Sequence, residues 1–287
     1  MMRLRSPLFA PGDSEHKIAK ALASAADAVI LDLEDAVAPA AKDAARHLVA
    51  TLLPGLQRSG VIVRVNPEAT PWHLADLAAV VPHHPAAILL PKCDAPETLV
   101  RLDLRLQALE VAAGLAPRSI GVLALVTETA AAVQALARYA PGLPRLIALS
   151  FGAEDLSADL GIRPRRATGT YAAPVATARA LTLIAASAAG VAAIDTPFPD
   201  PRDPTGFAAE ALAAASDGFS GKYLIHPNQI LPAHVAFTPS PERVHWAEDV
   251  AALFAANPDA GVLALNGAMI DRPHLKLARR ILAAAGR

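Results

Sequence analysis

The chain has 287 residues, 53% of them hydrophobic and 18% charged, so it is long enough to bury a large core in one or two domains. Its formal net charge of −1 excludes the basic imbalance that is typical of nucleic-acid binding or of attraction to an anionic membrane, and we expect neither partner. The single cysteine, Cys93, excludes an intrachain disulfide and favours a cytoplasmic location.

Short apolar runs alternate with longer segments rich in Ala and Leu up to residue 237. Strands are expected at 8–9, 28–33, 61–65, 87–90, 120–126, 146–150, 191–196 and 223–225, and helices at 15–23, 40–52, 72–80, 95–102, 130–138, 174–188, 206–215 and 229–236. Most of the strands are continuously apolar, which is typical of parallel strands covered on both faces. This alternation predicts an α/β fold, a (β/α)8 TIM barrel. An open, doubly wound sheet is the alternative, although no strand is followed by a Gly-rich phosphate loop.

The pattern changes after residue 237. A helix is expected at 242–256, a short apolar run at 261–265 and a final helix after Pro273. These residues are surplus to a closed barrel. We therefore expect a catalytic barrel domain at 1–237 and a C-terminal arm or lid at 238–287, packed on the barrel or on a neighbouring subunit.

Polar residues stand where the expected strands end, which is the side of a TIM barrel that carries active sites. They are Asp32, Glu34, Asp35, Arg64, Asn66, Lys92, Glu128, the segment 152–155, Asp195 and His226. Glu128 and Asp155 are two carboxylates that leave positions for water, a set that suits Mg²⁺. Arg64 is placed to take a substrate carboxylate in a bidentate manner. The alternative for each carboxylate is a helix cap after its strand.

The segment after the sixth strand adds backbone donors to this set. The amides of Gly152, Ala153 and Glu154 precede Asp155 and are placed to hold an anion of the substrate. Isolated basic residues such as Lys92 are candidate contacts for a coenzyme A phosphate, and Cys93 is expected to pack in the core.

Several short motifs together resemble one family. They are RSPLFAPG at 5–12, LDLEDAV at 31–37, VRVN at 63–66, LPK at 90–92, TET at 127–129, SFGAED at 150–155, IHPNQ at 225–229 and MID at 269–271. On these motifs the chain resembles the citrate lyase β-subunit-like branch of the HpcH/HpaI aldolase/citrate lyase superfamily, nearly from end to end.

The resemblance implies a TIM barrel, Mg²⁺ bound by Glu128 and Asp155, and Arg64 on the carboxylate of an oxaloacetate-like acid. It also implies that Asp271, on the C-terminal arm, is a general acid/base in its own or a neighbouring subunit's site, although a helix cap before Pro273 is the alternative. Glu34 and Asp35 are further catalytic candidates. Pyruvate aldolases of the superfamily carry a histidine where Asp35 falls, which favours the thioester branch here.

The expected activity is that of a Mg²⁺-dependent carbon–carbon lyase of the citrate lyase β-subunit type. It would cleave or form a 3-hydroxyacyl thioester such as citryl-, citramalyl- or malyl-CoA, with an oxaloacetate-like keto acid and an acyl thioester as the other side of the reaction. The carrier is coenzyme A or an acyl-carrier protein. The resemblance further implies a homo-oligomer, a trimer or hexamer, with citrate lyase α and γ subunits as candidate partners.

Two alternatives to this function remain open. The first is a non-catalytic or partner-dependent subunit that binds oxaloacetate and Mg²⁺. The second is a metal-dependent aldolase that acts on free 4-hydroxy-2-keto acids, and activity without coenzyme A would favour it.

Overall fold

The structure is a computed structural model that describes residues 2–56 and 60–287. The chain divides into two compact units, Met1–Ala233 and His234–Arg287. The boundary lies within a helix, α9 (Ile230–Phe237). The first unit contains all of the predicted site residues except Asp271, which lies in the second unit.

Parallel strands form an eight-stranded sheet in the first unit, in the order β1 to β8. They are β1 (Pro7–Pro11), β2 (Ala28–Asp32), β3 (Val61–Arg64), β4 (Ala87–Leu90), β5 (Gly121–Leu125), β6 (Leu146–Ser150), β7 (Ala192–Asp195) and β8 (Gly221–Lys222). The sheet closes on itself beyond β8, because Phe9 N donates to Leu224 O at 2.9 Å and Leu224 N donates to Pro7 O at 2.9 Å. The predicted (β/α)8 barrel is therefore confirmed.

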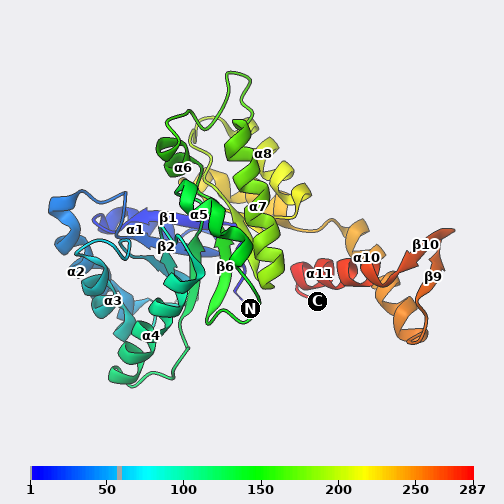
Figure 1. Ribbon diagram of the computed structural model, residues 1–287, viewed down its shortest axis with the longest axis horizontal. Helices are drawn as coiled ribbons and strands as arrows, with labels where there is room; N and C mark the ends of the chain where they lie inside the picture. The colour runs from blue at the N-terminus through cyan, green and yellow to red at the C-terminus, as the bar shows by residue number, and fades with distance from the viewer. Residues whose placement is uncertain (1, 57–59) are drawn as a thin grey trace. The chain divides into compact units, whose positions relative to one another are not determined.

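Helices follow the strands and lie outside the barrel wall (Figure 1). They are α1 (Glu15–Leu22), α2 (Lys42–Leu52), α3 (His73–Val80), α4 (Pro96–Ala112), α5 (Ala130–Ala135), α6 (Ala153–Asp159), α7 (Ala173–Ala189), α8 (Pro204–Asp217) and α9, with 3₁₀ turns at Pro39–Ala41, Leu53–Gly55, Val81–His83, Leu136–Arg138 and Pro227–Gln229. Helix α4 is longer than the expected 95–102, because its buried Asp103 and Glu110 form ion pairs with Arg145 at 2.5 and 2.6 Å. Helix α6, at the predicted anion segment, was not among the expected helices.

The last strand of the barrel differs from its prediction. It was expected at 223–225 and lies at Gly221–Lys222, while Leu224 forms an isolated bridge to Leu8. A Cβ atom at position 221 would lie 1.7 Å from the carbonyl oxygen of Leu4, so only glycine allows this close approach of the two chains.

The interior of the barrel is filled by side chains. Its buried cluster contains Leu4, Ala28, Ile30, Ile62, Ala87, Leu89, Leu123, Leu125, Ala148, Ile194 and Tyr223. Tyr223 and Ser150 are fully buried, and their hydroxyl oxygens lie 2.6 Å apart. Because this core closes the middle of the barrel, the open space lies at its rim.

The second unit contains α10 (Pro241–Ala256), the antiparallel hairpin of β9 (Val262–Leu265) and β10 (Ala268–Asp271), and α11 (Arg272–Ala285). Residues of α10, α11 and β10 share a core that includes Phe254 and Ile270. Strand β10 was not predicted, although Asn266-Gly267 is a typical two-residue hairpin turn and both residues have positive φ, 51° and 81°. None of the described helices is long and apolar enough to cross a membrane.

Candidate active site

A cavity of about 340 Å³ opens at the carboxyl ends of the barrel strands. Its lining includes Phe9, Pro11, Asp32, Ala36, Arg64, Leu125, Glu128, Phe151, Gly152, Ala153, Glu154, Asp155, Thr196, Pro197, Tyr223 and Ile225. Most of the predicted site residues of the first unit, separated by many positions in the chain, therefore meet around one space. A pocket with apolar walls and a few convergent charged groups is the usual form of a small-molecule site.

Arg64 ends β3 on the wall of this cavity, where two carboxylates hold its guanidinium. Its Nε and Nη2 atoms donate to Asp32 at 2.7 and 2.6 Å, and Nη1 lies 2.8 Å from Glu34 Oε2. The guanidinium also stacks on the Phe9 ring, 4.8 Å from its centroid. Burial lowers the pKa of Arg64, but the Asp32 and Glu34 carboxylates outweigh burial and raise it above its usual value. Asp32 occupies the Nε–Nη2 edge and Glu34 lies against Nη1, so a substrate carboxylate would use the N–H groups that remain on Nη1 and Nη2.

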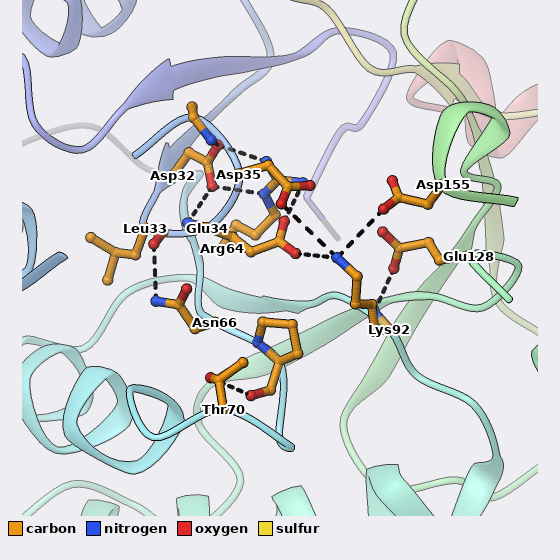
Figure 2. Close-up of polar contacts among 12 residues, drawn as sticks. Asp32, Leu33, Glu34, Asp35, Arg64, Asn66, Thr70, Lys92, Glu128 and Asp155 are labelled. Atoms are coloured by element: carbon orange, nitrogen blue, oxygen red, sulfur yellow. Dashed lines mark hydrogen bonds and ion pairs between the residues drawn. The ribbon is translucent and has the colours of Figure 1, made fainter. Parts of the chain in front are cut away.

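Lys92 follows β4 and lies between two groups of carboxylates (Figure 2). Its ammonium is 2.8 Å from Glu34 Oε1, 4.0 Å from Asp35 Oδ1 and 3.5 Å from Asp155 Oδ1. Its backbone amide donates a short hydrogen bond to Glu128 Oε2. Burial lowers the pKa of Lys92, but the surrounding carboxylates, Glu34 foremost, outweigh burial and raise it above its usual value.

Glu34 is the buried carboxylate that joins the two cations. Its side chain is 3% exposed and lies within 2.8 Å of both Arg64 and Lys92. Burial raises the pKa of Glu34, although both cations lower it. Glu34 Oε2 accepts no hydrogen bond from the described residues, so its contact with Arg64 is an ion pair without hydrogen-bond geometry. Asp35 is more open, with a side chain that is 57% exposed.

Glu128 and Asp155 lie together on the other side of Lys92 (Figure 2). Glu128 is 3% exposed, and burial raises its pKa to about 8, with further increases from the Asp155 and Glu34 carboxylates. A buried carboxylate that faces a second carboxylate fits a divalent cation, because the cation offsets both the burial and the repulsion. The described residues contain no group of three or more His, Cys, Asp and Glu side chains suited to a metal. A pair of carboxylates is a ligand set that suits Mg²⁺, because this cation keeps waters and substrate oxygens among its ligands.

Gly152, in the loop between β6 and α6, lies close to the side chain of Glu128. A Cβ atom at Gly152 would lie 3.0 Å from Glu128 Cγ, so a larger residue would push Glu128 out of place. Two of the predicted anion-binding amides already have partners: Gly152 N donates to Thr127 Oγ1 at 3.0 Å, and Ala153 N donates to Thr196 Oγ1 at 3.3 Å. Glu154 lines the cavity next in the chain.

Asp271 belongs to the second unit, at the N-terminus of α11. Its carboxylate caps that helix, and its Oδ1 atom lies 2.5 Å from His274 Nδ1. The helix-cap interpretation thus describes what Asp271 does within its own unit. Its carboxylate is half-buried and keeps an accessible side.

Two residues of the site have contacts that the sequence did not predict. Asp32 was noted only as a polar residue at a strand end, and it is the bidentate partner of Arg64. Lys92 was a candidate for a coenzyme A phosphate, and its ammonium lies among carboxylates instead. The density of acids at 32–35 is the signal in the sequence that cations besides Arg64 lie near, and the structure places both Lys42 and Lys92 there.

The chain is similar to known proteins over nearly its whole length. Residues 5–227 match the model of the HpcH/HpaI aldolase/citrate lyase family. Citrate lyase subunit beta of Escherichia coli (strain K12) is 36% identical and covers 98% of this chain and 93% of its own length. The mitochondrial citramalyl-CoA lyase of Rattus norvegicus is 33% identical and covers 98% and 86%. The crystal structure of CitE from Mycobacterium tuberculosis in complex with magnesium, acetoacetate and coenzyme A is 37% identical, with a TM-score of 0.77 and coverage of 99% and 100%.

Proposed function

This chain belongs to the HpcH/HpaI aldolase/citrate lyase family, and from that membership we propose a Mg²⁺-dependent carbon–carbon lyase that acts on a 3-hydroxyacyl thioester. Its relatives include a citrate lyase β subunit and a citramalyl-CoA lyase, which supports this reaction class. The observation that carries the proposal is the meeting of Glu128, Asp155 and Arg64 around one cavity. Citryl-, citramalyl- and malyl-CoA are the candidate substrates.

The residues of the barrel bind the keto-acid half. Glu128 and Asp155 would hold Mg²⁺, which when bound supplies a Lewis acid for the carboxylate and the adjacent oxygen of the keto acid. Arg64 donates to the carboxylate from the N–H groups that remain on Nη1 and Nη2, while Asp32 and Glu34 keep the guanidinium in place. Glu154 and the loop amides complete the cavity wall.

The acid/base group acts on the thioester half. In condensation it removes a proton from the thioester α-carbon, and in cleavage it returns a proton to that carbon. Asp271 is our first candidate, because its half-buried carboxylate keeps an accessible side. Asp35, exposed at the barrel rim, is the second candidate, whereas Glu34 holds Arg64 and Lys92 and acts through them.

Partners follow from the same proposal. The thioester carrier is coenzyme A or an acyl-carrier protein, and the keto acid resembles oxaloacetate. We also propose a homo-oligomer, a trimer or hexamer, in which Asp271 serves its own or a neighbouring subunit's site. Citrate lyase α and γ subunits are the candidate partners of a complex, and a cytoplasmic location remains our expectation.

The first experiment is an assay of purified protein with Mg²⁺ against citryl-, citramalyl- and malyl-CoA, with products identified by mass spectrometry. Asp155→Ala and Asp271→Ala should each abolish cleavage of the accepted thioester. Asp259→Ala is the matched control, because Asp259 is an exposed aspartate of the second unit. Full activity of Asp271→Ala would move the acid/base role to Asp35.

The same experiment separates the alternatives. No turnover of any thioester, with calorimetry still showing oxaloacetate binding that requires Asp155, would refute the stand-alone lyase and identify a partner-dependent subunit. Cleavage of free 4-hydroxy-2-keto acids without coenzyme A would identify the aldolase.

A further inference from the structure

Lys92 has more contacts at the rim than a surface lysine would have. Its ammonium lies 2.8 Å from Glu34 Oε1 and 3.5 Å from Asp155 Oδ1, and Figure 2 shows the side chain between these two carboxylates. Among the described residues, Asp155 forms its ion pair with Lys92. The ammonium therefore occupies the position of a counter-ion for a proposed metal ligand.

The backbone of Lys92 has an unusual conformation and contacts the site through its amide. Its φ is +48°, in the left-handed region that residues other than glycine rarely adopt. This conformation aims the amide of Lys92 at Glu128 Oε2. One residue thus contacts both proposed metal ligands, Glu128 through its backbone and Asp155 through its side chain.

The charges at the rim explain why a cation is needed there. Five carboxylates meet in this region, from Asp32, Glu34, Asp35, Glu128 and Asp155. Arg64 is bound to Asp32 and paired with Glu34, and the ammonium of Lys42 donates to the carbonyl oxygens of Leu33 and Glu34. Among the described cations, Lys92 forms the ion pair with Asp155, and its side chain is 36% exposed, which leaves it room to move.

We propose that Lys92 is the counter-ion that this site exchanges for Mg²⁺, and that this exchange couples the binding of the cation to the binding of the keto acid. The proposal rests on the proposed function, because it takes Glu128 and Asp155 as metal ligands. Without Mg²⁺, the ammonium neutralises Asp155. When Mg²⁺ binds, the ammonium is repelled from Asp155 and becomes a donor for the negatively charged keto acid.

Two measurable consequences follow. Removal of the ammonium removes a competitor for Asp155, so Mg²⁺ alone binds more tightly, by about tenfold. In such a variant Mg²⁺ increases the affinity for the keto acid by a smaller factor, because no displaced ammonium remains to bind the negatively charged keto acid. Each ligand changes the affinity of the other by the same factor, so the coupling can be measured from either side.

The test is calorimetric titration of the full chain with MgCl₂, alone and with saturating pyruvate as the probe keto acid. Lys92→Met removes the charge and keeps the stem, and Lys92→Arg keeps the charge. Lys92→Gly removes the whole side chain but suits the positive φ, so it preserves the amide contact to Glu128. Thermal unfolding of each variant checks that it is folded. Asp155→Asn should lose Mg²⁺ binding and so verifies the metal site independently.

Tighter Mg²⁺ binding in both Lys92→Met and Lys92→Gly, with Lys92→Arg close to the wild type and with reduced coupling to pyruvate in the uncharged variants, supports the proposal. Mg²⁺ binding that requires Asp155 but is unchanged or weaker in either uncharged variant overturns the role of Lys92 and leaves the proposed function intact. Absence of Mg²⁺ binding in all of the proteins overturns the metal site and the exchange together.

Discussion

The ion pair between Asp32 and Arg64 provides the sharpest test of how this site is built. The Asp32 side chain is 1% exposed, and the Arg64 side chain is 12% exposed. Asp32 also accepts hydrogen bonds from the amides of Glu34 at 2.9 Å and Ala36 at 3.3 Å. Asp32→Asn keeps the size of the side chain but removes its charge and places an amide group against a guanidinium.

We expect Asp32→Asn to lower the free energy of unfolding by about 3 kcal/mol, because it leaves a buried cation without its main partner. Arg64 would also lose its fixed orientation, so affinity for the keto acid should fall by about 100-fold. Urea denaturation followed by circular dichroism measures the first effect, and calorimetric titration with pyruvate and Mg²⁺ measures the second.

Asp43→Asn is the matched control. Asp43 also pairs with an arginine, Arg46, at 2.7 Å, but its side chain is 86% exposed. An exposed pair of this kind contributes about 0.5 kcal/mol or less. If Asp32→Asn and Asp43→Asn lowered the free energy of unfolding equally, burial would not be the reason that the Asp32–Arg64 pair matters for stability. A destabilised Asp32→Asn that binds pyruvate normally would refute the dependence of substrate binding on the orientation of Arg64.

Three further predictions concern other parts of the barrel. Hydrogen bonds from Arg101 lower the pKa of Glu68 from 4.5 to about 2, so the stabilisation by Glu68 is present above pH 4.5 and is lost as the pH falls toward 2. In Glu68→Gln, the free energy of unfolding measured by urea denaturation should fall by about 1 kcal/mol less over this pH range, and a pH dependence equal to that of the wild type would contradict the assignment. Burial raises the pKa of Cys93 to about 12, so the native thiol should resist iodoacetamide at pH 7.5 and react only in urea, and rapid native labelling would show that the thiol is accessible. Gly152→Ala places a Cβ atom 3.0 Å from Glu128 Cγ and should weaken Mg²⁺ binding by about tenfold in calorimetry with little loss of stability; unchanged affinity would separate Glu128 from the metal.

The strands of the barrel illustrate what local sequence determines. β4 and β6 lie at the residues expected from their apolar runs, because a strand covered on both faces excludes polar side chains along its whole length. The polar residues that follow such runs must then lie at the rim, so Arg64, Glu128 and Asp155 could be grouped before any distance was known. The family resemblance rests on the same short motifs, and the comparisons confirm it.

Only the tertiary structure decided which charges meet. Glu34 and Lys92 are separated by 58 positions and come together because β2 and β4 flank β3 in a closed sheet. Their pairing depends on register and on the left-handed backbone of Lys92, which no local pattern reveals. β8 was misplaced for a related reason, because hydrogen bonds to β1, across the closure of the barrel, determine how residues 221–224 pair. Apolar periodicity is a property of neighbours in the chain, whereas ion pairs depend on distances that only the closed barrel sets.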